Sequence, residues 1–182
     1  SVNTVVKQLD GSLLGDNTDA AGFEGMVWKS RMRILGRKCL VLGSGGASLS
    51  VQYVLRKLGA GEIVVISRTG EDNYTNLDRH RDASILVNTT PVGMYPQIDE
   101  MPVGREILEN TEYVFDAVYN PMETKLLKTA RECGCKVLGG LSMLVWQAAA
   151  SHKIWDGSQY TYDEIAALCE ETKQELLRVF PG

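Results

Sequence analysis

The stretch KCLVLGSGGAS, residues 38–48, decides the fold of this chain. Residues 39–42 form an uninterrupted apolar run that predicts a buried strand, and the run ends abruptly in glycines. A helical pattern follows at once, because apolar residues recur at helical spacing at Val51, Val54, Leu55 and Leu58. A second apolar strand is predicted at 63–66. This strand–helix–strand order, with glycines at its first corner, predicts a dinucleotide-binding unit.

The glycine corner has a physical reason to bind a diphosphate. Gly43 and Gly45 lack the Cβ atoms that would keep an anion away from the backbone. The following helix offers free N–H groups and the positive end of its dipole. The third fingerprint position holds Ser48 instead of Gly or Ala, so the motif is a variant of the strict pattern. The alternative is that the glycines only close a turn. The two flanking strands favour the nucleotide site over this alternative.

The end of the second strand indicates which dinucleotide binds. NAD-binding proteins place an acid there, whereas this chain continues with Ser67, Arg68 and Thr69. The Arg68 guanidinium offers a planar fork for a 2′-phosphate, and the two hydroxyls can add donors. The alternative is that Arg68 is an ordinary solvated arginine. Its position directly after the second strand favours binding of NADP instead. Glu71 and Asp72 follow closely and would weaken the attraction for phosphate, so exclusive use of NADP does not follow.

Composition narrows the functional class. The 182 residues are 44% hydrophobic and 23% charged with a net charge of −4, which is ordinary for a globular protein. The chain has no basic run and no apolar stretch of about 18–20 residues, so we expect neither nucleic acid nor a membrane as a partner. The spacing of the four cysteines fits no zinc site. We therefore expect that the chain binds no metal, that its thiols are reduced and that it is located in the cytoplasm.

The order of predicted elements indicates an α/β fold. Strands alternate with helices through short connections, which predicts a Rossmann-like doubly wound parallel sheet with helices on both faces. Ahead of it, Asp10-Gly11 predicts a hairpin, and a helix follows that buries Phe23, Met26 and Val27. Further strands are expected at 84–88, 113–118 and 136–138, and further helices at 104–110, 123–133, 141–152 and 163–179. We divide the chain into a hairpin with a linker helix (1–34), an NADP-binding domain (35–152) and a C-terminal helix (153–182).

Taken in order, several blocks of the sequence resemble the cofactor-binding part of the shikimate/quinate dehydrogenase family. The resemblance covers nearly the whole chain and rests on VNT at 2–4, GDNTD at 15–19, GSGGAS at 43–48, SRT at 67–69, NTTPVGM at 88–94, YNPMET at 119–124 and GLSMLVWQA at 140–148. A methylene-tetrahydrofolate dehydrogenase would share the architecture, but the Asn17–Asp19 block and Gln147 disfavour it.

The resemblance implies an oxidoreductase that reduces 3-dehydroshikimate to shikimate with NADPH, or runs the reverse, in chorismate and aromatic amino-acid biosynthesis. It implies that Asp19 belongs to a catalytic Lys/Asp pair and hydrogen-bonds the substrate hydroxyls together with Asn3. Gln147 and Tyr119 would also contact the substrate. The cofactor would be held by Gly43, Ser44, Gly45, Gly46, Ala47, Ser67, Arg68, Thr69, Thr89, Val118, Gly140 and Met143.

The family also carries an amino-terminal substrate domain that supplies the catalytic lysine, and this chain starts at the VNT segment. We therefore expect a fragment, with a hairpin and helix left over from a missing substrate domain, that binds cofactor without turnover. We expect apolar side chains to be exposed on the hairpin and the last helix, where that domain would pack. The alternatives are a non-catalytic dinucleotide-binding module and a quinate/shikimate dehydrogenase that uses NAD. The sequence indicates no oligomeric state.

Overall fold

A computed structural model describes residues 1–179, and its centre is a five-stranded parallel sheet. The order of the strands is β4-β3-β5-β6-β7. Their bounds are Lys38–Leu42 for β3, Glu62–Ile66 for β4, Ile85–Asn88 for β5, Tyr113–Asp116 for β6 and Lys136–Leu138 for β7. Neighbouring strands pair in parallel throughout, which confirms the predicted sheet.

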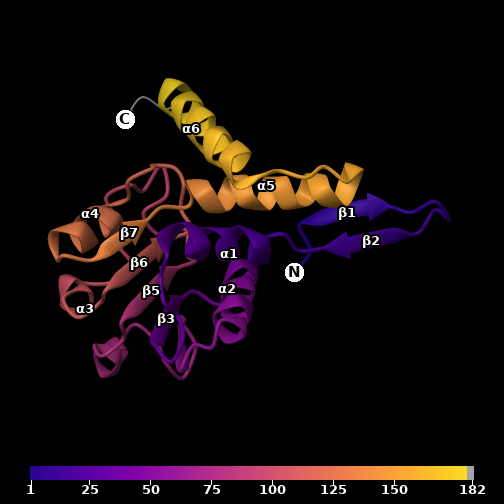
Figure 1. Cartoon of the computed structure of the whole chain (residues 1–182). Helices are drawn as coiled ribbons and strands as arrows, with labels where there is room; N and C mark the ends of the chain where they lie inside the picture. The colour runs from indigo at the N-terminus through magenta and orange to yellow at the C-terminus, as the bar shows by residue number, and fades with distance from the viewer. Residues whose placement is uncertain (180–182) are drawn as a thin grey trace.

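Helices cover both faces of this sheet (Figure 1). Buried side chains of α1 (Asp19–Ser30), α2 (Gly46–Lys57) and α5 (Leu141–Asp156) share one apolar cluster with the sheet. The opposite cluster holds the 3-10 turn η1 (Leu77–His80), α3 (Arg105–Leu108) and α4 (Lys125–Glu132). The last helix, α6 (Tyr162–Val179), packs Ile165 and Cys169 against α5. No helix within residues 1–179 is both long enough and apolar enough to cross a membrane.

Strand β3 shows why its sequence is an unbroken apolar run. Cys39 and Val41 point into the cluster of α1, α2 and α5, whereas Leu40 and Leu42 point into the opposite cluster. Successive strand residues face opposite sides, so a strand covered on both faces needs apolar residues at every position. The Rossmann-like fold class is therefore confirmed.

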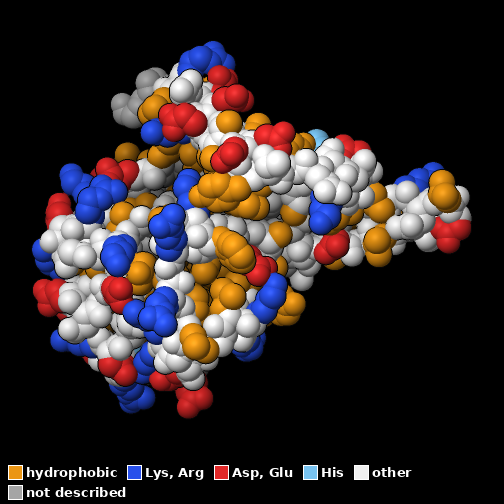
Figure 2. Space-filling model, in the orientation of Figure 1, with side chains coloured by type: hydrophobic (Ala, Val, Ile, Leu, Met, Phe, Trp, Pro, Cys, Tyr) orange, Lys and Arg blue, Asp and Glu red, His pale blue; other side chains and the backbone are white. Residues whose placement is uncertain are grey.

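The chain begins with a separate antiparallel hairpin. Strand β1 (Thr4–Lys7) pairs with β2 (Leu13–Asp16), and the pair projects beyond the end of α5 (Figure 1). The hairpin predicted from Asp10-Gly11 is confirmed, and at its tip the Asp10 carboxylate accepts hydrogen bonds from the backbone and hydroxyl of Ser12. Val5 is 52% exposed and Leu13 72%. Hydrophobic side chains therefore lie open on the hairpin (Figure 2), which confirms the expected exposure there.

Several predicted bounds were wrong. Strand β6 ends at Asp116 rather than residue 118, because the Asp116 carboxylate accepts a hydrogen bond from the Val118 N–H and turns the chain. Helix α5 continues to Asp156, where Gly157 ends it in the left-handed conformation. Our boundary at residue 152 thus falls inside a helix. Helix α1, which we placed in the separate segment 1–34, packs on the sheet. The division into 1–34, 35–152 and 153–182 stays a prediction.

Candidate functional site

The glycine corner joins the ends of three strands. Gly43 adopts φ +104°, and its N–H donates to the Ile66 carbonyl of β4 at 2.8 Å. A Cβ built on Gly43 would lie 2.8 Å from the Thr89 hydroxyl, which follows β5. That hydroxyl donates to the Leu42 carbonyl of β3 at 2.6 Å. Only glycine fits this conformation without strain, so the corner brings the backbone to the carboxyl edge of the sheet.

Helix α2 begins at this corner with an open N-terminus. Gly45 is the N-cap residue, and no side chain caps the first turn. A Cβ built on Gly45 would find no described atom within 4 Å apart from its chain neighbours. Free N–H groups at a helix start with open space before them suit an anion. Ser44 is exposed, Gly46 and Ala47 are half-buried in the first turn, and the Ser1 side chain lies close to Gly46. Binding of a diphosphate by these residues stays a prediction.

Ser48 explains the departure from the strict fingerprint. It is buried completely, and its hydroxyl accepts a hydrogen bond from the Gln52 side chain at 3.1 Å. The third fingerprint position serves the close packing of helix against strand, so a small residue whose hydroxyl has a partner satisfies it.

The segment after β4 presents the predicted phosphate recognition residues. Arg68 and Thr69 are exposed, and Ser67 is half-buried. Burial raises the pKa of the neighbouring Tyr74 phenol, and the positive charge of Arg68 opposes that rise. Arg68 thus lies on the solvent side, directly after the strand next to the glycine corner.

A second group of predicted residues comes together where the hairpin meets α1 and α5. The Asn3 side-chain amide donates to the Asp19 carboxylate at 2.8 Å. Both residues line a cavity of about 440 Å³ with Gln147 of α5. The rest of the lining consists of Thr18, Leu144, Ala148, Ser151, His152 and Trp155. Three of the four predicted substrate residues thus share one cavity.

Buried hydroxyls that the sequence analysis missed hold this group in place. The Ser151 hydroxyl lies 3.0 Å from that of Thr4 and 3.1 Å from that of Thr18. The Asn3 side-chain carbonyl also accepts from the Thr18 backbone N–H at 2.9 Å. These bonds tie β1, α1 and α5 together. The available signal was weak: Ser151 follows Gln147 by one helical turn, on the same face of α5.

Asn17 joins this polar group to the helix at the glycine corner. Its side-chain carbonyl accepts from the Asp19 backbone N–H at 2.9 Å and from the Ser50 hydroxyl of α2 at 3.1 Å. The start of α1 and the second turn of α2 are therefore in direct contact, which connects the two candidate regions.

The remaining predicted residues lie at the end of β6. The Gly140 N–H donates to the Val118 carbonyl at 3.0 Å, which places the start of α5 beside this strand end. Val118 is buried, whereas Tyr119 is 41% exposed and does not line the Asn3 cavity. Met143 is only 7% exposed and belongs to the core cluster that contains Phe23. Contact of these residues with a nicotinamide stays a prediction.

A buried carboxylate shapes the same edge of the sheet. Asp116 accepts hydrogen bonds from the Asn88 amide at 3.0 Å, the Thr124 hydroxyl at 2.6 Å and the Val118 N–H at 3.0 Å. Burial raises its pKa, and the three hydrogen bonds oppose that rise. Asp116 thereby binds the ends of β5 and β6 to the start of α4. The sequence analysis did not identify it.

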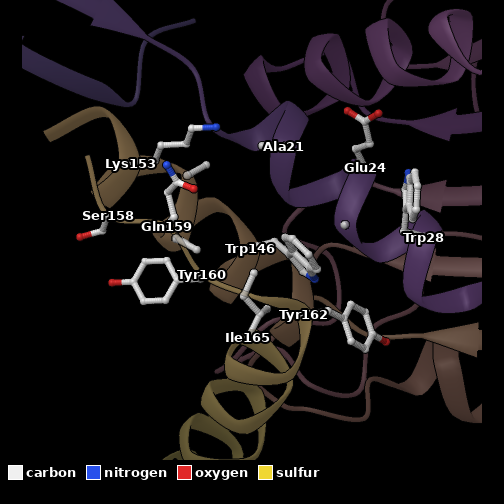
Figure 3. A pocket seen from close by; sticks show the side chains of 13 residues that line it. Ala21, Glu24, Trp28, Trp146, Lys153, Ser158, Gln159, Tyr160, Tyr162 and Ile165 are labelled. Carbon is white, nitrogen blue, oxygen red and sulfur yellow. The ribbon is translucent and has the colours of Figure 1, made fainter. Parts of the chain in front are cut away.

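A larger hollow lies elsewhere. A cavity of about 480 Å³ opens between α1, α5 and the start of α6, and aromatic side chains including Trp28, Trp146, Tyr160 and Tyr162 line it (Figure 3). None of the predicted site residues lines this cavity. Because it contains none of these residues, we do not take this larger cavity as the candidate functional site.

Comparisons with known proteins agree with this geometry. No protein-family model matches the chain. A protein of Clostridium perfringens named shikimate dehydrogenase (NADP⁺) is 36% identical over 186 residues, which cover 95% of this chain and 68% of the relative. The chain spans 65% of the length of a second such relative, from Caldanaerobacter subterraneus, also at 36% identity.

Solved structures show the same similarity. The chorismate mutase/shikimate 5-dehydrogenase fusion protein of Clostridium acetobutylicum has a TM-score of 0.91 and 36% identity, over 96% of this chain and 68% of that one. Shikimate 5-dehydrogenase of Thermus thermophilus, in complex with NADP(H) and shikimate, has a TM-score of 0.81 and 33% identity, over 94% of this chain and 68% of that one. With two thirds of such relatives matched in both sequence and fold, the chain belongs to the shikimate dehydrogenase family.

Proposed function

We propose that this chain is the cofactor-binding part of an NADP-dependent shikimate dehydrogenase, which reduces 3-dehydroshikimate to shikimate. The observation that carries the proposal is the direct Asn3–Asp19 hydrogen bond on a cavity shared with Gln147 and tied through Asn17 to the helix of the glycine corner. The names of the relatives support the same activity.

The cofactor would lie along the carboxyl edge of the sheet. The open N-terminus of α2 and the bare backbone at Gly43 and Gly45 would hold the diphosphate. The Arg68 guanidinium would bind the 2′-phosphate, with the hydroxyls of Ser67 and Thr69 beside it. The nicotinamide end would adjoin the remaining predicted residues Thr89, Val118, Gly140 and Met143. NADPH, when bound, supplies the hydride of the reaction.

The polar cavity would orient the substrate. The Asp19 carboxylate accepts a hydrogen bond from Asn3 and has acceptor capacity left for a substrate hydroxyl. The Gln147 amide can both donate and accept, and Tyr119 would approach from the end of β6. Reduction of a ketone places negative charge on its oxygen, which requires a proton donor. We assign that donor to a lysine in the part of the relatives that this chain does not match, with Asp19 as its partner.

The hairpin exposes apolar side chains on both of its strands. We infer that the exposed apolar side chains of β1 and β2 pack on a substrate domain, because the chain spans only 65–68% of its relatives' length. On its own, the chain would then bind cofactor without turnover. Its four free cysteines support a location in the cytoplasm.

Titration of the chain with NADPH and with NADH tests the cofactor. We expect NADPH to bind more tightly, and Arg68→Ala to reduce its affinity by about 10- to 100-fold, the range for losing one or two charge-assisted hydrogen bonds, with little effect on NADH. Arg81→Ala is the matched control, because Arg81 is an exposed arginine paired with Asp78 on η1. Equal affinity for both cofactors would favour the NAD-using alternative, and binding of neither would refute the proposal.

The substrate role needs a protein that joins this chain to the remaining third of its relatives' length. In that protein, Asp19→Asn should lower kcat by about 10²- to 10⁴-fold, the usual range for a group that assists proton transfer. Asp163→Asn, at an exposed position in the first turn of α6, is the control. Tight NADPH binding without any shikimate-dependent turnover in the joined protein would favour the non-catalytic module.

A further inference from the structure

The loop after β4 contains an aspartate close to the proposed phosphate site. The Ser67 N–H donates to the Asp72 backbone carbonyl at 3.2 Å, so residue 72 lies beside the immediate neighbour of Arg68. A carboxylate there would compete with a phosphate for the guanidinium. The Asp72 carboxylate instead accepts a hydrogen bond from His80 Nε2 at 2.8 Å.

His80 is well placed to retain this carboxylate. Its side chain is only 12% exposed, and it sits on η1, which Leu77 anchors in the core. The other ring nitrogen, Nδ1, is buried and has no hydrogen-bond partner among the residues that the structure describes. The His80 imidazole therefore makes its hydrogen bond within the described chain to Asp72. Because a carboxylate only accepts, the hydrogen lies on Nε2 of His80.

The loop itself does not depend on His80. The Asn73 N–H donates to the Asn76 side chain at 2.9 Å, and the Asn76 amide donates to the Glu71 carbonyl at 2.9 Å. The Asn73 amide also donates to the Gly70 carbonyl at 3.2 Å. Loss of the histidine would therefore release the carboxylate of Asp72 while these bonds keep the backbone in place.

Arg68 is the cation that a released carboxylate would meet. It is exposed, and it makes no ion pair with any residue in the range 1–179. We propose that His80 determines cofactor specificity: it holds the Asp72 carboxylate back and so leaves Arg68 free for the 2′-phosphate of NADP. This inference rests on the proposed function, because it assumes that Arg68 receives that phosphate.

Dissociation constants for NADP and NAD, measured on the chain and its variants, test the proposal. His80→Leu keeps the volume of the side chain but cannot donate. It should reduce the preference for NADP about tenfold, the order expected for one carboxylate approaching a phosphate at a partly screened surface. The affinity for NAD should stay the same. His80→Gln, which can still donate, should retain most of the preference.

A second substitution separates charge from structure. The double variant His80→Leu/Asp72→Asn should recover the preference for NADP, because the released group no longer carries charge. Asp78→Asn, which breaks the exposed Asp78–Arg81 pair on the same turn, is the control and should leave the preference unchanged.

Three results would overturn the inference. An unchanged preference in His80→Leu, in a chain that does favour NADP, would refute the role of His80 and leave the proposed function intact. An equal loss in the single and double variants would show that the loop had lost its structure instead. If the wild-type chain shows no preference for NADP, both the inference and the proposed cofactor fail.

Discussion

A methyl group added at either glycine of the corner should separate folding from cofactor binding. At Gly43 the backbone adopts φ +104°, and the new Cβ would lie 2.8 Å from the Thr89 hydroxyl and 3.1 Å from the Thr90 methyl. At Gly45 the backbone is extended, at φ −81° and ψ −169°, and the Cβ would enter open space. Gly43→Ala is therefore strained in the protein alone, whereas Gly45→Ala obstructs only a bound anion.

The magnitudes follow from this geometry. Strain at a conformation reserved for glycine costs about 1–3 kcal/mol. Displacing Thr89 also weakens its hydrogen bond to Leu42, which contributes about 1 kcal/mol. Gly43→Ala should thus lose about 2–4 kcal/mol, or roughly 4–16 °C in Tm for a domain of this size. Gly45→Ala should lose about 1 kcal/mol or less, the difference between glycine and alanine at an N-cap.

Two measurements check the pair. Thermal unfolding followed by circular dichroism gives the stabilities, and titration with NADPH gives the affinities. We expect Gly45→Ala to fold almost normally and to bind NADPH at least about tenfold more weakly, because the methyl group occupies the space of the diphosphate. Normal NADPH affinity in Gly45→Ala would refute the proposed position of the diphosphate. A Gly43→Ala variant as stable as the wild type would refute the argument about strain.

Three further predictions concern groups that support the site. Ser151→Ala should lower the free energy of unfolding by about 1 kcal/mol, because Thr4 and Thr18 keep their other hydrogen bonds; urea denaturation measures this. Burial raises the pKa of Asp116, so its protonated form favours the fold at low pH and that contribution is lost as the pH rises through the raised pKa. The destabilisation by Asp116→Asn, measured by urea unfolding, should therefore be larger near pH 4 than near pH 7. Burial also raises the pKa of Cys39 to about 12, so iodoacetamide should label Cys39 only after unfolding, while the half-buried Cys133 should react first.

The parts of the site that could be predicted from the residues alone are those encoded locally, whereas Asn3, Asp19 and Gln147 were predicted only from the resemblance to a family. Residues 38–48 contain a buried strand, a turn and a helix start within one short stretch, and the chemistry of each residue limits its role. The geometry of the corner follows from Gly43 and from the Thr89 that meets it. By contrast, Ser151 and Thr4 are 147 residues apart, and neither residue type signals a partner. Only the packing of α5 against β1 brings them together.

Errors at the ends of elements had a similar cause. We ended the helix of α5 at His152 and overlooked Gly157 as the stop signal. Strand β6 reads as apolar beyond Asp116, yet the buried Asp116 carboxylate accepts a hydrogen bond from the Val118 N–H, and the strand ends there. In both cases, a residue that does not fit the apolar pattern ends the element.

The base of the hairpin has a different role from its tip. Asn3 bonds to Asp19 and Thr18, Thr4 is buried with Ser151, and the Val5 carbonyl accepts a hydrogen bond from the Trp155 indole at 3.2 Å. These contacts all come from α1 and α5, which are part of the sheet domain. The Asn3–Asp19 pair is therefore positioned by the cofactor-binding part itself, whatever covers the apolar side chains farther along the hairpin. Groups positioned before a ligand arrives lose little freedom on binding it, so the substrate domain proposed above would have only to add its own residues to an arrangement that already exists.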